Sequence, residues 1–75
     1  MRTRSILPGL GKEIRERRVR LKLSQEGLAG LVGIHTNVVG RLERGRYNTT
    51  VDTLFSIAVK LNVPLSELFA GAEKR

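Results

Sequence analysis

The most restrictive feature of this sequence is a gap of about three residues between two stretches with helical periodicity. The first stretch, residues 25–32, follows Ser24, which is expected to cap it, and ends at Gly33, which suits a positive φ. The second begins near Thr36 and ends at Gly45. A connection this short cannot lay two helices flat against each other, so the pair must cross steeply.

Helical periodicity continues over the rest of the chain, without the alternating apolar pattern of a β-strand. A first helix is predicted from about Pro8 to Lys22, a fourth after the cap at Thr50, and a short fifth that opens at Pro64. We therefore predict an all-α fold, a compact bundle of five short helices. The apolar positions expected to build its core are Leu10, Ile14, Leu21, Leu28, Leu31, Val32, Val51, Leu54, Phe55, Ala58, Leu61, Leu65, Leu68 and Phe69.

Charge is distributed unevenly along the chain. The formal net charge of +7 lies wholly in residues 1–46, whereas the charges of residues 47–75 sum to zero. This asymmetry favours a half that faces a polyanion and a neutral half, with a merely solvated basic surface as the alternative. We expect one domain, with its core at about residues 8–70 and a short basic arm at residues 1–7.

The residue types in this sequence do not indicate a zinc site, a catalytic site or a nucleotide-binding loop. The chain has no cysteine, and its only histidine, His35, has no acidic neighbour with which to bind zinc. No pair of acids is placed for catalysis, and no phosphate-binding glycine loop is present. We expect no enzyme activity, no cofactor and no metal. The N-terminal segment lacks the apolar stretch of a signal peptide or a membrane span.

Residues 23–69, LSQEGLAGLVGIHTNVVGRLERGRYNTTVDTLFSIAVKLNVPLSELF, carry the motifs SQE-x-LA, a central glycine, LERG and a closing LxELF. This run resembles the Xre/Cro-type helix-turn-helix domain of phage repressors and many bacterial regulators, and the resemblance covers about Gly11 to Phe69. The segment from Gly40 to Asn48 also resembles the controller proteins of restriction–modification systems. The resemblance implies a lambda-repressor-like DNA-binding domain in which residues 25–45 form the helix-turn-helix.

Two charged residues fall on the apolar faces of predicted helices. Arg18 shares the stripe of Ile14, and Glu43 shares a face with Val39. A charge turned inward is tolerable only when it is paired and hydrogen-bonded. Each residue is the other's obvious partner, and the resemblance implies an Arg18–Glu43 ion pair that ties the first helix to the third. The alternative is that both side chains reach solvent separately.

The resemblance also implies that the third helix enters the major groove of double-stranded DNA. Carried over by position, Thr36, Asn37 and Arg41 are expected to contact base edges. Arg41 can bind guanine O6 and N7, Asn37 can bind adenine N6 and N7, and Thr36 can meet a thymine methyl or accept a hydrogen bond. For each of them an ordinary solvated side chain is the alternative. Gly40 either permits a close approach of the backbone to DNA or contacts nothing.

Phosphate contacts are expected on both sides of this helix. Gln25 begins the second helix, where free backbone amides and the helix dipole favour an anion. Tyr47 is expected to be structural, whereas Arg2 and Arg4 form an arm that either enters a minor groove or frays. The complete set of predicted phosphate contacts is Gln25, His35, Arg44, Arg46 and Asn48.

The neutral half is expected to serve assembly. The resemblance implies that Val63, Leu65 and Phe69 pair two subunits, and the alternative is that they only cap the monomer core. The leading hypothesis is a transcriptional regulator, a repressor or an activator–repressor, that binds an inverted-repeat operator as a homodimer. The alternative is an antitoxin-type protein that neutralises a partner protein and represses its own operon. We expect a bacterial or phage-encoded cytoplasmic protein, associated with the nucleoid when bound and not with a membrane.

Overall fold

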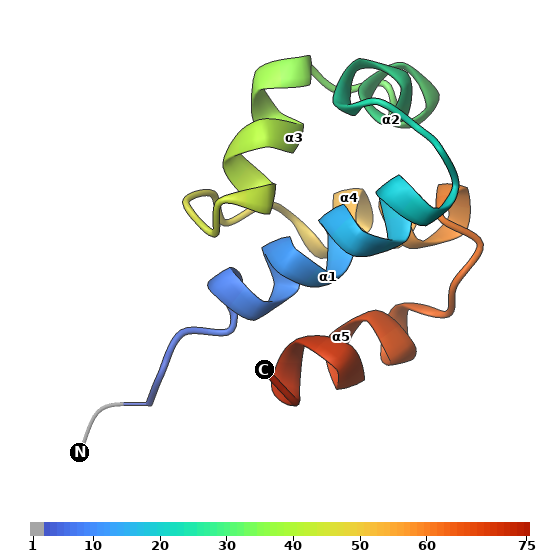
Figure 1. Ribbon diagram of the computed structural model, residues 1–75. Coiled ribbons are helices and arrows are strands. Elements are labelled where there is room, and N and C mark those ends of the chain that lie inside the picture. The colour runs from blue at the N-terminus through green and yellow to red at the C-terminus, as the bar shows by residue number, and fades with distance from the viewer. Residues whose placement is uncertain (1–2) are drawn as a thin grey trace.

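The computed structural model describes residues 3–75, and within that range it consists of five α-helices and no strand (Figure 1). The predicted all-α bundle is confirmed. In Figure 1, α3 lies above α1 and α5 lies below it, while α2 packs against α3 and α4. The helices are α1 (Leu7–Arg20), α2 (Gln25–Val32), α3 (Thr36–Glu43), α4 (Val51–Lys60) and α5 (Leu65–Glu73).

Local capping contacts mark the ends of α2 and the start of α3. Ser24 is the N-cap of α2, because its Oγ accepts a hydrogen bond of 2.8 Å from the backbone N–H of Gly27. Gly33 ends α2 with φ at 82°, as a left-handed C-terminal residue. His35 then caps α3, because its Nδ1 accepts the Asn37 N–H at 3.1 Å. The imidazole thus caps α3 in place of the Ser, Thr, Asp or Asn side chain that is usual at this position of a helix.

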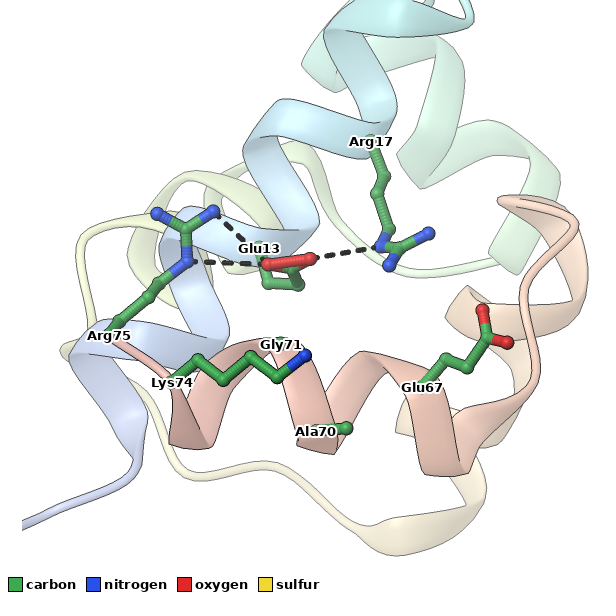
Figure 2. A pocket seen from close by; sticks show the side chains of 7 residues that line it. All are labelled: Glu13, Arg17, Glu67, Ala70, Gly71, Lys74 and Arg75. Atoms are coloured by element: carbon green, nitrogen blue, oxygen red, sulfur yellow. Dashed lines mark hydrogen bonds and ion pairs between the residues drawn. The ribbon is translucent and has the colours of Figure 1, made fainter.

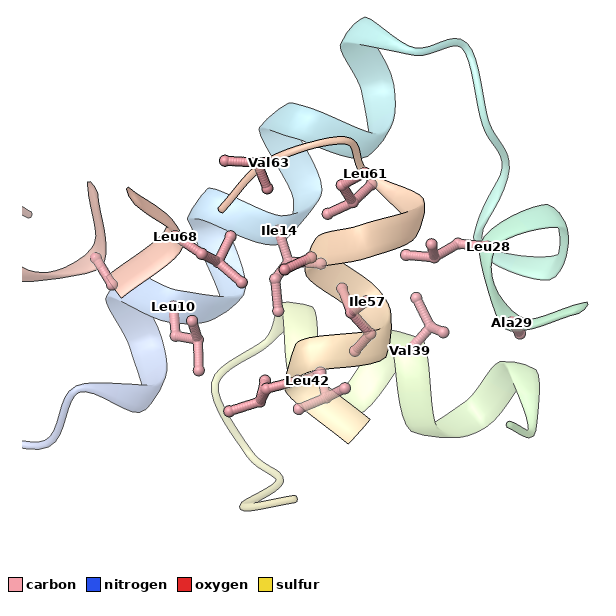
Figure 3. Packing of buried hydrophobic residues seen from close by; sticks show 13 residues of the cluster. Leu10, Ile14, Leu28, Ala29, Val39, Leu42, Ile57, Leu61, Val63 and Leu68 are labelled. Carbon is pink, nitrogen blue, oxygen red and sulfur yellow. The ribbon is translucent and has the colours of Figure 1, made fainter. Parts of the chain in front are cut away.

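The hydrophobic core lies where all five helices meet (Figure 3). Its most completely buried side chains come from α1, α2, α3, α4 and α5, so no helix is peripheral to it. This shared core holds α3 at a set angle to the rest of the bundle. The fully buried side chains of largest volume are Ile14, Leu28, Val39, Ile57 and Leu68.

Some of the residues of α4 that were predicted to face the core are exposed. Val51 and Phe55 are 67% and 55% exposed, and Ile57, which the apolar pattern did not single out, is fully buried. The reason is that α4 carries apolar residues on both sides, so periodicity alone does not select a face. Leu31 of α2 and Leu21 after α1 were also expected inside and are exposed.

Val63 was predicted at a subunit interface and instead belongs to the monomer core. It is 8% exposed, and its backbone N–H donates to the carbonyl of Ala58 at 3.0 Å. Asn62 adopts a positive φ of 59°, which reverses the chain after α4 and turns Val63 inward. Leu65 and Phe69 are half-buried and pack against the same core.

α1 and α3 approach each other closely because residue 11 has no side chain. A β-carbon on Gly11 would overlap the carbonyl oxygen of Leu42 and lie 2.7 Å from that of Glu43. Both obstructing atoms belong to backbone and cannot rotate away. The Gly11 contact therefore sets the distance between α1 and the helix that carries the predicted DNA contacts.

Gly11→Ala is expected to destabilise the fold by about 1–3 kcal/mol, because the two helices must move apart. The matched control is Gly30→Ala, since Gly30 is also helical and has no atom within 4 Å of the added β-carbon. Alanine there should be neutral or stabilising by up to about 1 kcal/mol. Urea denaturation followed by circular dichroism measures both. Equal effects of the two variants would show that helix propensity, and not the α1–α3 contact, governs the result.

Two negative findings apply to residues 3–75. No single helix there is long and apolar enough to cross a membrane, and α4 and α5 reach that length and composition only as a pair bent by 100°. Nor do His, Asp and Glu side chains in this range form a group of three that could hold a metal ion.

Candidate nucleic-acid interface

The outward face of α3 is hollowed. Thr36, Asn37, Gly40 and Arg41 follow one another at helical spacing, so they share this face, and Arg44 continues it just beyond the helix. They border an open hollow of about 370 Å³, which we call the α3 hollow. The structure thus brings the three predicted base-contacting residues together with two of the predicted phosphate contacts. The α3 hollow is lined by Gln25, Thr36, Asn37, Gly40, Arg41 and Arg44.

A buried ion pair holds α3 from behind. Arg18 of α1 meets Glu43 of α3 in a two-pronged contact, with Nε–Oε2 at 2.6 Å and Nη2–Oε1 at 2.9 Å. The two side chains are only 10% and 3% exposed. The hydrogen bond to Glu43 raises the pKa of Arg18 above its usual value. The guanidinium also donates to the backbone carbonyl of Leu23 at 2.8 Å, so each of its three nitrogens makes a hydrogen bond within the fold.

Gln25 connects this ion pair to the α3 hollow. Its Nε2 donates to Glu43 Oε1 at 3.0 Å, and its Oε1 lies 3.6 Å from the position of a β-carbon on Gly40. The side-chain amide is therefore held by the protein itself. A phosphate contact from Gln25 would use the first turn of α2, where the helix dipole favours an anion.

Gly40 is buried although it faces the hollow. A β-carbon there would lie 3.3 Å from Arg44 Nη1, so the Arg44 guanidinium occupies the space that a side chain at position 40 would take. In this arrangement Gln25 and Arg44 cover the backbone of Gly40. A close approach of that backbone to DNA would require Arg44 to swing aside.

The remaining predicted phosphate contacts lie around the hollow and not in its lining. His35 is exposed and caps α3 through its Nδ1. Arg46 and Asn48 are exposed in the segment between α3 and α4. Their positions leave all three side chains at the protein surface.

The Arg41 guanidinium lies over the Tyr47 ring in a cation–π contact that the sequence did not reveal. The Arg41 guanidinium carbon lies 4.9 Å from the centre of the Tyr47 ring. Gly45, with φ at 71°, turns the chain back after α3 and brings Tyr47 beside it. The turn was predictable from the glycine, but the side on which the ring would lie was not. The expectation that Tyr47 is structural therefore omits its contact with a predicted base-contacting residue.

A second charged cluster lies between α1 and α5 (Figure 2). Glu13 is bound on both sides, by Arg17 Nε at 3.2 Å and Arg75 Nη2 at 3.1 Å. Arg75 also meets Glu16 at 2.6 Å, and this contact lowers the pKa of Glu16. Gly71 leaves room for the Glu13 carboxylate, which a β-carbon at that position would overlap. Glu13, Arg17 and Arg75 line a pocket of about 510 Å³, and their contacts link α1 to the end of the chain after α5.

The predicted basic arm is held at the same end of the molecule. Arg4 donates to the carbonyl oxygens of Arg75 at 2.7 Å and Glu73 at 2.8 Å. In this structure the Arg4 guanidinium is therefore bound at the end of α5, and its predicted entry into a minor groove stays a prediction. Arg2, the other residue of the predicted arm, lies outside the described residues.

Exposed apolar side chains gather on α4 and α2. Val51, Phe55 and Val59 form one stripe along α4 at intervals of four residues, and Leu31 of α2 stands beside it. Phe55, Val59 and Leu31 border a shallow groove of about 270 Å³. We call these four residues the α4 face. It leaves far more apolar surface open than Leu65 and Phe69, which pack against the core.

Comparison with protein families and curated proteins gives consistent matches. The family model described as Helix-turn-helix matches residues 14–68. An uncharacterized transcriptional regulator in the ATPase CF(0) region of Rhodospirillum rubrum is 35% identical over 65 residues, which cover 87% of this chain and 60% of that protein. This chain thus spans less than two thirds of that relative. The control protein C.SmaI of Serratia marcescens is 37% identical over 59 residues, which cover 79% of this chain and 70% of that protein.

Solved structures give the same picture. The restriction-modification controller protein C.AhdI from Aeromonas hydrophila superposes with a TM-score of 0.80 at 37% identity, covering 83% of this chain and 94% of that one. The clp gene regulator ClgR from Corynebacterium glutamicum superposes with a TM-score of 0.90 and covers 95% of this chain and 76% of that one. Its identity of 21% makes it evidence for the fold alone.

Proposed function

This chain belongs to the helix-turn-helix family of DNA-binding transcriptional regulators, and we propose that it binds an inverted-repeat operator as a homodimer. The observation that carries the proposal is the α3 hollow, where the three side chains predicted to contact bases lie on one face of a helix that the core and the Arg18–Glu43 pair hold in place. The similarity to the restriction-modification controller protein C.AhdI supports a regulatory role, which we propose to be repression, or activation and repression, at this operator.

Base recognition is assigned to three side chains of α3. Arg41 offers a planar fork for guanine O6 and N7, and Asn37 offers a donor and an acceptor for adenine N6 and N7. Thr36 stands at the start of α3, where it can contact a thymine methyl or accept a hydrogen bond. Thr36 and Asn37 follow the usual docking of a recognition helix, in which N-terminal residues contact base edges, whereas Arg41 lies in the last turn of α3.

Phosphate binding is assigned to the groups around α3. The first turn of α2 at Gln25 offers the positive end of a helix dipole, and the exposed side chains offer cations and hydrogen-bond donors. The net charge of +7 in residues 1–46 supports a DNA-facing half. The assigned side chains are His35, Arg44, Arg46 and Asn48.

Selection of bound sequences from random DNA duplexes tests the proposed function. The expected result is an inverted repeat whose half-site centres lie about 10–10.5 base pairs apart, because each subunit of a two-fold dimer presents one α3 to the same side of the duplex. Enrichment of a single unrepeated motif would contradict the homodimer. Failure to enrich any motif would contradict sequence-specific binding itself.

Arg41→Ala is expected to weaken binding to the selected operator by about 1–3 kcal/mol and to remove the preference at one base pair per half-site. The matched control is Arg46→Ala, which removes the same charge outside the α3 hollow. It should weaken binding to all duplexes alike and make the salt dependence shallower. Fluorescence anisotropy with single-base operator variants at several salt concentrations measures both. If Arg46→Ala changes the base preference and Arg41→Ala does not, Arg46 contacts the base and Arg41 does not, contrary to the proposal.

A homodimer is proposed because one recognition helix contacts too few base pairs. A regulator must select its site among about 10⁶–10⁹ competing sites, and two copies of α3 double the sequence information. The α4 face supports a second copy as its occupant, because it is apolar and three of its four residues belong to residues 47–75, whose charges sum to zero. A face without net charge lets two strongly basic molecules meet without direct repulsion.

A further inference from the structure

Tyr47 is anchored, whereas the arginine beside it is not. The Tyr47 ring is half-buried and packs against the core, while the Arg41 side chain is exposed at the α3 hollow. The backbone also holds the ring in place, because the Arg46 N–H donates to the Arg41 carbonyl at 2.9 Å and closes the turn after α3. A fixed aromatic face therefore stands next to a long side chain that would otherwise sample many rotamers.

The geometry of this contact suits recognition. A cation–π contact is held by the attraction between the cation and the ring and uses none of the guanidinium N–H groups as hydrogen-bond donors, so the donors of Arg41 stay available. Arg44 occupies a different part of the α3 hollow, over Gly40 and beside Gln25. The ring thus restricts Arg41 without competing for the hydrogen bonds that a guanine requires.

We propose that Tyr47 is a positioning residue for base recognition, which holds the Arg41 guanidinium in the orientation that reads a guanine in the major groove. The proposal rests on the proposed function and extends it to a residue outside α3. The benefit comes from pre-organisation, since an exposed cation–π contact favours the orientation over the ring by roughly 2- to 5-fold. Tyr47 contributes no base contact of its own.

The test replaces Tyr47 in three ways. Tyr47→Phe keeps the aromatic face and removes only the hydroxyl, Tyr47→Leu keeps apolar volume without an aromatic face, and Tyr47→Ala removes both. For each variant, discrimination is measured as the ratio of Kd values for the selected operator and for the same operator with the base pair read by Arg41 replaced. Affinity for a random duplex and the thermal midpoint are measured alongside.

Tyr47→Phe is expected to discriminate like the unmodified protein, and Tyr47→Leu is expected to lose roughly 2- to 5-fold of the discrimination while binding random DNA unchanged. In an Arg41→Ala background, Tyr47→Leu should have no further effect on discrimination, because the two residues act through one contact. In the unbound protein, ring-current shifts of the Arg41 Cδ protons should be present with Tyr or Phe at position 47 and absent with Leu. This last readout needs no DNA and tolerates a modest loss of stability.

Three results would overturn the proposal. They are an unbound protein without ring-current shifts at Arg41, a Tyr47→Phe variant that loses as much discrimination as Tyr47→Leu, and a Tyr47→Leu variant with full discrimination. In the last case Arg41→Ala separates the two proposals. If Arg41→Ala alters base preference and Tyr47→Leu does not, only the positioning role fails. If Arg41→Ala also leaves base preference unchanged, the reading role of Arg41 fails, and the positioning role with it.

Discussion

Glu43→Ala is expected to destabilise the fold by roughly 3–5 kcal/mol, because it leaves the Arg18 guanidinium buried without its counter-charge. The alanine variant also strips the Gln25 amide of its acceptor at the rim of the α3 hollow. A domain of this size has a total stability near the low end of about 5–15 kcal/mol. The variant should therefore retain only about 0–2 kcal/mol of stability and be partly unfolded near physiological temperature, which thermal and urea denaturation measure.

Two controls separate the ion pair from other effects. Glu16→Ala removes an ion pair of the same 2.6 Å length at the surface, where solvent screens it, and its effect should be much smaller. The double change Arg18→Met with Glu43→Leu replaces both charges by apolar groups of similar size and should recover much of the lost stability. If the losses from Arg18→Met and Glu43→Leu simply add in the double variant, the direct pairing is refuted.

Val59→Glu, alone or with Phe55→Glu, is expected to give a folded monomer whose operator affinity is lower by about 10²–10⁴-fold. The affinity falls because the second half-site is no longer bound from a tethered copy. Both residues are more than half exposed, so the fold should survive, whereas a carboxylate buried at the interface without a partner would prevent association. Sedimentation at micromolar concentration, circular dichroism and operator binding measure the three effects.

Val19→Glu is the matched control for the α4 face. Val19 and Val59 are the same residue type, both 54% exposed and both on helices, but Val19 lies on α1. Val19→Glu should remain a dimer. If Val59→Glu remains a dimer and Phe69→Glu is a folded monomer, the interface lies on α5 and not on the α4 face. An unmodified protein that sediments as a monomer and still binds one half-site tightly would refute the homodimer, and a co-purifying second chain would favour the antitoxin-type alternative.

Local chemistry decided which segments of this chain are helical. Ser24 and Thr50 stand where a side-chain oxygen can accept an N–H of the first turn, and Gly33 and Gly45 adopt the positive φ that ends a helix cheaply only at glycine. These signals act over three or four residues, so the sequence alone is enough to locate the helix ends that they produce. The all-α fold and the steep turn before α3 followed from them.

One contact between residues far apart in the sequence could also be predicted, from the need of a buried charge for a partner. Arg18 and Glu43 both interrupt apolar stripes, and a buried charge needs an opposite charge, so the two could be matched across 25 positions of the chain. Helical spacing alone likewise places Thr36, Asn37 and Arg41 on one face of α3. Neither inference required knowledge of how the helices pack.

Other features were decided only by tertiary packing. α4 is apolar around most of its circumference, so either side could have faced the core, and the positions of α2 and α5 select Ile57 and leave Phe55 exposed. The cation–π contact of Arg41 with Tyr47 and the attachment of Arg4 to the end of α5 likewise join residues whose contact has no local signature. Periodicity and capping report the environment of one helix at a time, whereas these contacts depend on the relative positions of several helices.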